Sequence, residues 1–366
     1  MNMTKRIFHG NYVHIVGARP NFMKMAPVFR ALDGRAPQNI IHTGQHYDAR
    51  MSGDFFQVLD IPEPEINLAV GSGSHAEQTG RILIELGAHF ESSRPRGLIV
   101  YGDVNSTLAA TLAASKLGVP VIHVESGLRS HDNTMPEEIN RLVVDRLSDL
   151  LLTHSREADE NLRREGISDK KIVFVGNTMI DTLKRMLPQA RALDLSGLEL
   201  PEGPYGLVTL HRPSNVDDAR QLKSIADALV ETAKRIPLVF PVHPRTRAKF
   251  SALELSLPGV QLVDPQGYLT FIALQDRATV VVTDSGGVQE ETTWLNTPCL
   301  TLRPNTERPV TISDGTNTLL GEDPRGILPH VCAVLEDRYK NACAPEGWDG
   351  AAAVRAADAI IKKFGV

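Results

Sequence analysis

Residues 97–125 read GLIVYGDVNSTLAATLAASKLGVPVIHVE, and this stretch contains one complete strand–helix–strand unit. Two short apolar runs, Gly97–Tyr101 and Val119–Glu125, predict β-strands. Between them the turn at 102–106 leads into an alanine-rich helix that continues through Lys116. A helix between two short apolar strands is typical of a parallel sheet whose faces are covered by helices.

The same alternation extends toward both ends of the chain. Further strands are predicted at 12–17, 39–42, 150–153, 172–175, 207–210, 238–242, 279–283 and 299–302. Helices are predicted at 22–32, from 177, at 217–235, at 269–278, from 287 and at 351–364. The pattern is interrupted at 187–205, a stretch rich in Pro, Gly and Leu. We therefore expect an α/β protein with two Rossmann-like domains, 1–186 and 206–346, a linker at 187–205 and a final helical segment at 347–366.

Composition narrows the class of protein. The chain has 366 residues, of which 42% are apolar and 23% charged, so it is neither disordered nor a coiled coil. The formal net charge of -5 argues against nucleic acid or an anionic membrane as partner. No apolar run approaches the roughly 18 residues of a membrane-spanning helix, and Met1–Gly10 lacks a signal-peptide pattern. With 3 cysteines and no CxxC pair, we expect a reduced, cytoplasmic protein.

The segment TDSGGVQEE, Thr283–Glu291, follows a predicted strand and opens a helix. Gly286 and Gly287 allow the backbone to approach a ligand, and the N–H groups of a first helical turn attract an anion. Ser285 can cap the helix or bond a phosphate oxygen. The alternative is that the glycines only shape a tight turn and the glutamates complement the helix dipole. Because the spacing is neither GxGxxG nor a Walker motif, it predicts no dinucleotide fingerprint.

Basic residues lie at the start of the first predicted helix, where 17–24 reads GARPNFMK. Cations at this position oppose the helix dipole, and an anion bound between Arg19 and Lys24 would compensate for that cost. The alternative is that both are ordinary surface charges.

Acidic residues follow two neighbouring strands of the first domain. Asp103 and Glu125 each end a predicted strand, so both lie at the carboxyl edge of the sheet. In the segment PEEINR, Glu137 and Arg141 share one face of a helix. Acids and an arginine gathered at one edge suit proton transfer. The alternative is a helix-start cluster with an exposed ion pair worth about 0.3–0.5 kcal/mol.

Histidines and aromatic residues are weaker signals. His211 and His243 each follow a predicted strand of the second domain, although a lone histidine is more often structural. There is no HExxH motif, and His42 and His46 flank a loop glycine, so no metal site is expected. An aromatic ring beside a glutamine can stack on a base, and an arginine can reach a phosphate. Gln266, Phe271 and Arg308 flank the TDSGGVQEE segment in this way.

Taken together, ten segments form a pattern that no single one shows. In chain order they read GARPNFMKMAP, HTGQHYD, YGDVNSTLAA, HVESGLRS, MPEEINR, GNTMID, TLHRPSN, PVHPR, DSGGVQEE and TERP, from residue 17 to 309. This pattern resembles the non-hydrolysing UDP-N-acetylglucosamine 2-epimerases. The resemblance implies the GT-B fold of UDP-glycosyltransferases and glycogen phosphorylase, with a C-terminal helix that crosses back to the first domain.

The resemblance also implies an activity and its residues. The activity is reversible epimerisation at C2 of UDP-N-acetylglucosamine to UDP-N-acetylmannosamine, through elimination of UDP to a 2-acetamidoglucal and re-addition. The implied catalytic residues are Asp103, Glu125, Glu137, Arg141 and His211. The implied UDP-binding residues are Arg19, Lys24, Gln266, Phe271, Ser285, Gly286, Gly287, Glu291 and Arg308. The phosphates would lie at the Ser–Gly–Gly helix start, the uracil near Gln266 and Phe271, and the ribose at Glu291. The resemblance implies no cofactor and no metal. It implies a cytoplasmic homodimer that serves cell-surface polysaccharide synthesis.

Three departures from the family pattern keep alternatives open. His211 is followed by RPSN where the family often has RREN, and Val310 stands where an acid is frequent. The stretch 70–75 lacks a basic residue that many relatives use for an allosteric UDP-sugar, although Gln45 and His46 remain. The alternatives are a 2-epimerase of a modified UDP-sugar such as a 2,3-diacetamido uronic acid, a hydrolysing epimerase, a GT-B glycosyltransferase and a nucleotide-sugar-binding module.

Overall fold

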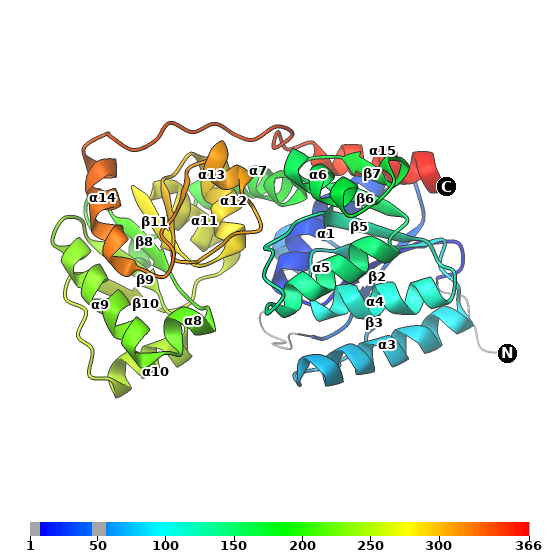
Figure 1. The fold of residues 1–366 in the computed structure, drawn as a ribbon, viewed down its shortest axis with the longest axis horizontal. Helices are drawn as coiled ribbons and strands as arrows, with labels where there is room; N and C mark the ends of the chain where they lie inside the picture. The colour runs from blue at the N-terminus through cyan, green and yellow to red at the C-terminus, as the bar shows by residue number, and fades with distance from the viewer. Residues whose placement is uncertain (1–7, 46–55, 366) are drawn as a thin grey trace. The chain divides into compact units, whose positions relative to one another are not determined.

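The structure, a computed structural model, describes residues 8–45 and 56–365 and divides into two compact units (Figure 1). Unit 1 consists of Met1–Thr182 together with Glu346–Val366, and unit 2 consists of Leu183–Pro345. Each unit has its own parallel sheet with helices on its faces, which confirms the expected α/β class with two Rossmann-like domains. In the described part of the chain, no helix has both the length and the apolar character needed to cross a membrane.

The sheet of unit 1 has 7 parallel strands in the order β3-β2-β1-β4-β5-β6-β7. The strands are β1 (Tyr12–Val16), β2 (Gln38–His42), β3 (Ile66–Asn67), β4 (Gly97–Tyr101), β5 (Val121–Ser126), β6 (Leu150–Thr153) and β7 (Ile172–Phe174). All residues of β1, β4, β5 and β6 are buried, as expected for central strands with helices on both faces.

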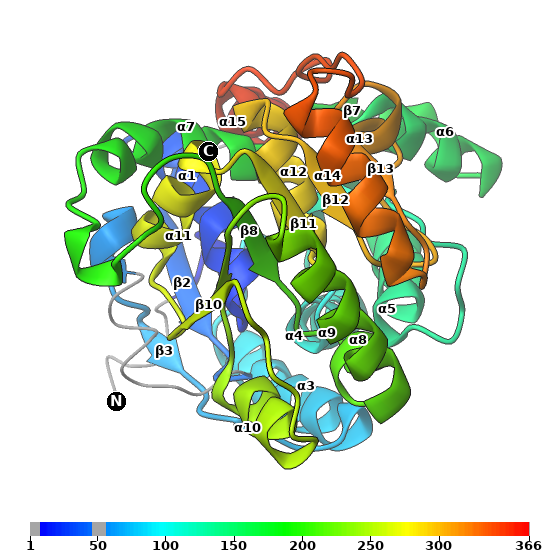
Figure 2. The ribbon, with the colours of Figure 1, turned by 90° about the vertical axis from the view of Figure 1, so that its left-hand side faces the viewer.

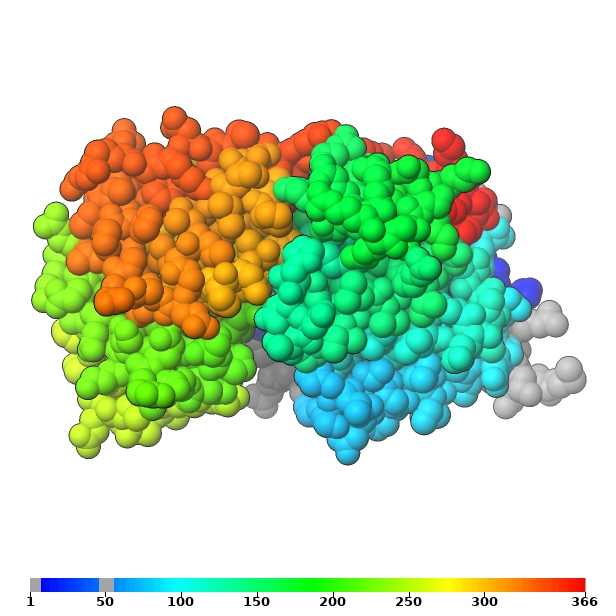
Figure 3. Space-filling model, viewed as in Figure 1, coloured from blue at the N-terminus to red at the C-terminus, as the bar shows by residue number. Residues whose placement is uncertain are grey.

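Helices cover both faces of this sheet. One face carries α3 (His75–Ser92), α4 (Asn105–Lys116) and α5 (Pro136–Leu147), which pack side by side. In Figure 3 the surface of this unit passes from the light blue of α3, through the cyan and teal of α4 and α5, to the green of α6 (Arg156–Arg164). The opposite face carries α1 (Arg19–Leu32), which packs against α15 (Ala352–Phe364).

The C-terminal segment belongs to unit 1, as expected. Trp348 is 2% exposed, and its indole Nε1 donates to the carbonyl oxygen of His154 at 3.0 Å. Asp181, on α7 (Thr178–Arg191), accepts hydrogen bonds from the N–H groups of Ala352 and Ala353 at 3.2 and 2.7 Å and so caps α15. These contacts hold the last helix on the first Rossmann-like domain.

The sheet of unit 2 has 6 parallel strands in the order β10-β9-β8-β11-β12-β13. The strands are β8 (Gly206–Thr209), β9 (Leu238–Pro241), β10 (Val260–Val263), β11 (Val280–Thr283), β12 (Cys299–Thr301) and β13 (Asn317–Leu319). The helices are α8 (Pro213–Val216), α9 (Ala219–Ala233), α10 (Pro244–Ala252), α11 (Tyr268–Arg277), α12 (Gly286–Leu295), α13 (Val310–Ser313) and α14 (Ile327–Leu335). Figure 2 shows α9 and α14 on one side of strands β8 and β11 and α11 on the other.

In each sheet the strand order reverses between two central strands. The reversal lies between β1 and β4 in unit 1 and between β8 and β11 in unit 2. Ligands of open α/β sheets bind at the carboxyl ends of the strands at such a reversal. Arg19 and Asp103 follow β1 and β4, and His211 and Ser285 follow β8 and β11. Both units therefore place predicted site residues where the topology favours a ligand.

Several elements differ from their predicted form. Helix α1 begins at Arg19 rather than Phe22, because Pro20 suits a first turn and the Asn21 side chain accepts the N–H groups of Gly17 and Ala18 at 3.1 and 3.0 Å. Helix α3 was not predicted, although Ser74 and Glu77 form a capping box at its start. Part of the stretch expected as linker, 187–205, is structured: α7 extends to Arg191, and a 3-10 helix lies at Ser196–Leu198.

Candidate active site

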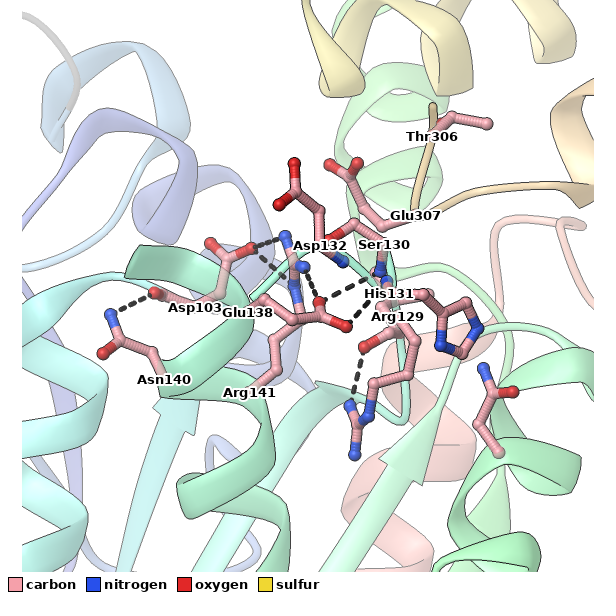
Figure 4. Close-up of polar contacts among 12 residues, drawn as sticks. Asp103, Arg129, Ser130, His131, Asp132, Glu138, Asn140, Arg141, Thr306 and Glu307 are labelled. Atoms are coloured by element: carbon pink, nitrogen blue, oxygen red, sulfur yellow. Dashed lines mark hydrogen bonds and ion pairs between the residues drawn. The ribbon is translucent and has the colours of Figure 1, made fainter. Parts of the chain in front are cut away.

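An arginine joins two carboxylates at the carboxyl end of the first sheet. Arg141 Nη2 and Nε donate to Asp103 Oδ2 at 2.7 and 3.0 Å, and Arg141 Nη1 donates to Glu138 Oε2 at 2.5 Å. Figure 4 shows the Arg141 guanidinium between the two carboxylates. The Arg141 side chain is 3% exposed and that of Asp103 22% exposed. Arg141 is therefore the buried anchor, and Asp103 is the carboxylate that a ligand can reach.

Glu138 ties the loop after β5 to helix α5. Its carboxylate accepts hydrogen bonds from the N–H groups of Ser130 and His131 at 3.0 and 2.9 Å (Figure 4). Burial alone would raise the pKa of Glu138, but these two donors and Arg141 outweigh it and lower the pKa. On the same helix, Asn140 Nδ2 donates to the carbonyl oxygen of Asp103 at 2.8 Å. The backbone and the side chain of Asp103 are thus both held by α5.

Lys24 and Glu125 form a second buried pair. Lys24 Nζ lies 2.5 Å from Glu125 Oε2, and the two side chains are 6% and 4% exposed. Glu125 has a φ of 69° at the point where the register between β5 and β6 shifts. A glutamate with left-handed backbone angles costs about 1–3 kcal/mol. Such strain and such register shifts change the direction of a side chain, and both are frequent at functional sites. A Cβ at Gly102, whose φ is 61°, would lie 3.0 Å from Lys24 Nζ. Glycine at 102 therefore leaves room for the lysine.

A fully buried histidine supports the two strand ends from behind. His123 Nδ1 lies 2.7 Å from Asp145 Oδ1, and His123 Nε2 lies 2.9 Å from the carbonyl oxygen of Gly102, the residue before Asp103. Asp145 also pairs with Arg129 at 2.7 Å and accepts the N–H of Gly127 at 3.0 Å. Burial would raise the pKa of Asp145, but His123 and Arg129 lower it. This network joins β4, β5 and α5 beneath the acidic residues.

A pocket of about 320 Å³ lies beside Asp103 and Glu137 and is bordered by amide side chains. Gln45 lines it, and Gln45 Oε1 accepts hydrogen bonds from the N–H and Oγ of Ser106 at 3.0 and 2.6 Å. Glu137 is half-buried in the first turn of α5, and Arg19 is exposed as the first residue of α1. His46, predicted together with Gln45, lies outside the described residues.

In unit 2, Ser285 is at the N-cap position of α12, but its side chain makes no capping hydrogen bond, and Gly286 and Gly287 begin the first turn. A Cβ at Gly286 would lie 2.7 Å from Arg308 Nη1 and 3.0 Å from Glu307 Oε1. Glycine at 286 therefore allows the Arg308 guanidinium to lie against the helix start. A cation and the first N–H groups of a helix at one place form a seat for an anion such as a phosphate.

Buried acids hold Arg308 in this position. Arg308 Nε lies 3.0 Å from Glu290 Oε1, and Arg308 Nη1 also pairs with Glu307. The neighbouring Glu291 accepts a hydrogen bond from Gln275 Nε2 at 2.7 Å. Burial, reinforced by the charge of Glu290, raises the pKa of Glu291 to about 7 despite this hydrogen bond. The Glu291 carboxyl is thus a buried polar group beside Glu290, the acid that pairs with Arg308.

The remaining predicted residues of unit 2 lie around the same sheet edge. His211 follows β8, and its side chain is 58% exposed, with Nδ1 3.0 Å from Asp284 Oδ1. Gln266 Nε2 donates to the carbonyl oxygen of Asp264 at 2.7 Å, just before α11. Phe271 lies in the first half of α11 and is half-buried.

Sequence reasoning missed the acids that hold the predicted cations and His211. These are Glu138, Asp284, Glu290 and Glu307. All four lie within the quoted segments, but the spacing of a segment does not show which of its acids faces inward. Within 8–45 and 56–365, no three or more His, Cys, Asp or Glu side chains are grouped so that they could hold a metal ion.

The fold places the protein in the class of two-domain α/β proteins with a GT-B-like architecture. A family model described as UDP-N-acetylglucosamine 2-epimerase matches residues 30–361. The chain belongs to this family, as the sequence pattern predicted.

Individual relatives agree with this assignment. The UDP-N-acetylglucosamine 2-epimerase of Methanocaldococcus jannaschii is 40% identical over 89% of this chain and 93% of its own length. The crystal structure of that archaeal enzyme in complex with UDP-GlcNAc and UDP superposes with a TM-score of 0.89, at 39% identity, covering 96% of this chain and 99% of the other. The UDP-2,3-diacetamido-2,3-dideoxy-D-glucuronate 2-epimerase of Pseudomonas aeruginosa is 45% identical over 84% of this chain and 87% of its own length.

Proposed function

We propose that this protein interconverts UDP-N-acetylglucosamine and UDP-N-acetylmannosamine without hydrolysis. The observation that carries the proposal is the set of ion-paired carboxylates at the switch point of the first sheet, in a chain of this family. Relatives named for this reaction at 40% and 41% identity support it.

The chemistry of the sugar explains why acids are needed. The C2 hydrogen has no adjacent carbonyl, so its removal requires that a good leaving group depart with it. A carboxylate takes the C2 proton, the C1–O bond breaks, and its electron pair leaves on UDP; the new C1–C2 double bond makes a 2-acetamidoglucal. UDP then adds back while a proton reaches the opposite face of C2. Two proton-transfer groups on opposite sides of the ring are therefore required.

We propose Asp103, Glu125 and Glu137 as the groups that share this proton transfer. Asp103 has the clearest geometry, because Arg141 holds one carboxylate oxygen, Oδ2, from two nitrogens and leaves Oδ1 for the sugar. Arg141 is then a positioning residue. Glu125 is oriented by Lys24, and Glu137 lines the pocket beside Asp103.

We propose that unit 2 binds the UDP group. The diphosphate would occupy the helix start at Ser285, Gly286 and Gly287, where N–H groups and Arg308 stabilise the charge that develops as UDP leaves. Glu291 would bond the ribose, Gln266 and Phe271 would contact the uracil, and His211 would contact the diphosphate. Arg19 and Lys24 complete the proposed nucleotide-binding set. Lys24 also pairs with Glu125 and would therefore affect both nucleotide binding and the orientation of the Glu125 carboxylate.

We further propose that Gln45 and His46 contribute to an effector site for a second UDP-sugar. Gln45 lines the same pocket as Asp103 and Glu137, so this effector site would adjoin the catalytic carboxylates. A cytoplasmic homodimer is proposed on the family resemblance, and light scattering coupled to size exclusion tests the assembly.

The test is product analysis by ¹H NMR with UDP-N-acetylglucosamine as substrate. The proposal predicts an equilibrium mixture of the two intact UDP-sugars. Release of free N-acetylmannosamine and UDP would indicate a hydrolysing enzyme. Turnover only of the UDP-2,3-diacetamido uronic acid would move the substrate assignment to that sugar. If neither UDP-sugar were changed by the protein, the proposal that it is an epimerase would be contradicted.

A further inference from the structure

Asp284 is a fully buried carboxylate at the switch point of the second sheet. It follows β11, and its side chain is 0% exposed. It accepts hydrogen bonds from the N–H groups of His211 and Arg212 at 3.0 and 2.9 Å and from Asn215 Nδ2 at 3.0 Å. These donors come from the segment that follows β8, so Asp284 connects the ends of the two strands at which the strand order reverses.

The same carboxylate contacts the His211 ring. His211 Nδ1 lies 3.0 Å from Asp284 Oδ1. Burial would raise the pKa of Asp284, but His211, Asn215 and the N–H of Arg212 lower it, so the group is an ionised acceptor. A carboxylate can only accept a hydrogen bond, and Nδ1 must therefore carry the hydrogen. That leaves Nε2 as the atom that takes up or gives a proton.

We propose that Asp284 is a positioning residue that holds the His211 ring as its Nδ1–H tautomer and makes Nε2 the atom that meets the substrate. This inference rests on the proposed function, in which His211 contacts the diphosphate of the departing UDP. When Nε2 is protonated, the buried carboxylate balances the charge of the imidazolium, which then donates to the diphosphate. Removing the carboxylate that orients a metal-bound histidine typically costs about 10–100-fold in activity, and we expect a loss of similar size here.

A substitution at Asp284 can change its contact with the His211 ring and keep its contacts with backbone N–H groups. An asparagine at 284 keeps one carbonyl oxygen for the N–H groups of His211 and Arg212. Its amide –NH₂ can instead donate toward Nδ1, which moves the ring hydrogen to Nε2. Asn215→Ala is the control, because it removes one donor to the same carboxylate, and one to the carbonyl oxygen of Leu302, both at 3.0 Å, while the contact of Asp284 with His211 Nδ1 stays.

The experiment has two readouts on the full-length protein. First, ¹⁵N NMR of labelled histidine, with the His211 signal assigned by its loss in His211→Asn, reports the tautomer without substrate. We expect Nδ1–H in the wild type and in Asn215→Ala, and Nε2–H in Asp284→Asn. A wild-type ring with hydrogen on Nε2 would overturn the proposal even if Asp284→Asn failed to fold.

Second, steady-state kinetics separates positioning from a structural role. Asp284→Asn should lower kcat about 10–100-fold with a smaller change in KM, and adding it to His211→Asn should cause no further loss. If the two substitutions lowered kcat independently, so that their fold-losses multiplied in the double variant, the proposal would be overturned. If no UDP-sugar is turned over at all, the proposed function fails, while the tautomer measurement still decides the role of Asp284.

Discussion

Lys24 Nζ lies 2.5 Å from Glu125 Oε2, and both side chains are almost completely buried. The lysine belongs to the expected nucleotide-binding set and the glutamate to the expected catalytic set, so the two sets meet within unit 1. A buried ion pair is strongly destabilising when only one partner is removed, by about 3–5 kcal/mol, because the other charge remains without compensation.

Lys24→Met should therefore destabilise the protein by about 3–5 kcal/mol in urea unfolding. The double variant Lys24→Met/Glu125→Gln should recover most of this stability, because the unpaired charge is gone, but not the activity. A loss below about 0.5 kcal/mol in the single variant would show that the pair contributes little.

Asp103→Asn should lower the rate of sugar epimerisation at least about 100-fold, because the amide cannot take up the C2 proton. The fold should survive, since Arg141 retains its contact with buried Glu138 at 2.5 Å. The control is Glu91→Gln, which neutralises an exposed acid at the end of α3. Near-wild-type turnover by Asp103→Asn would remove Asp103 from the catalytic set.

Gly286→Ala should weaken UDP binding about 10-fold, measured by titration calorimetry. The added Cβ would lie 2.7 Å from Arg308 Nη1 and would displace the guanidinium from the helix start. Gly197→Ala is the matched control, because a Cβ there meets nothing within 4 Å. Equal affinities of the two variants for UDP would argue against an anion seat at this helix.

Much of the fold could be predicted from the sequence, since long buried strands and amphipathic helices leave periodic patterns. Strands β3, β10 and β13 were not predicted, because their sequences IN, VQLV and NTL form no continuous apolar run and they are only partly buried at the sheet edges. For the site, the sequence indicates the correct segments but not every contact within them. The segment PEEINR predicts Glu137 and Arg141 on one helix face, but the glutamate that binds Arg141 at 2.5 Å is Glu138. Which of two adjacent acids faces inward depends on the loop 126–135, whose path no local pattern determines.

Glu291→Gln tests the pH dependence of stability. The pKa of this carboxyl rises from an ordinary 4.5 to about 7 in the folded protein, so the folded state binds the proton more tightly than the unfolded state. Its contribution to stability is therefore intact below about pH 4.5 and is lost as pH rises through about 7.

The wild type and Glu291→Gln should accordingly have similar free energies of unfolding at pH 5, and at pH 8 the variant should be more stable by about 1–3 kcal/mol. Urea unfolding at the two pH values measures this. A constant difference across the range would show that Glu291 does not titrate on unfolding as described.

The most direct test of C2 proton transfer is isotope exchange in heavy water. UDP-N-acetylglucosamine is incubated with the protein in D₂O, and both UDP-sugars are recovered and analysed by NMR and mass spectrometry. Elimination and re-addition of UDP predict one deuterium at C2 in intact UDP-N-acetylglucosamine and UDP-N-acetylmannosamine, and none at other carbons. Epimers that retain hydrogen at C2 would contradict it.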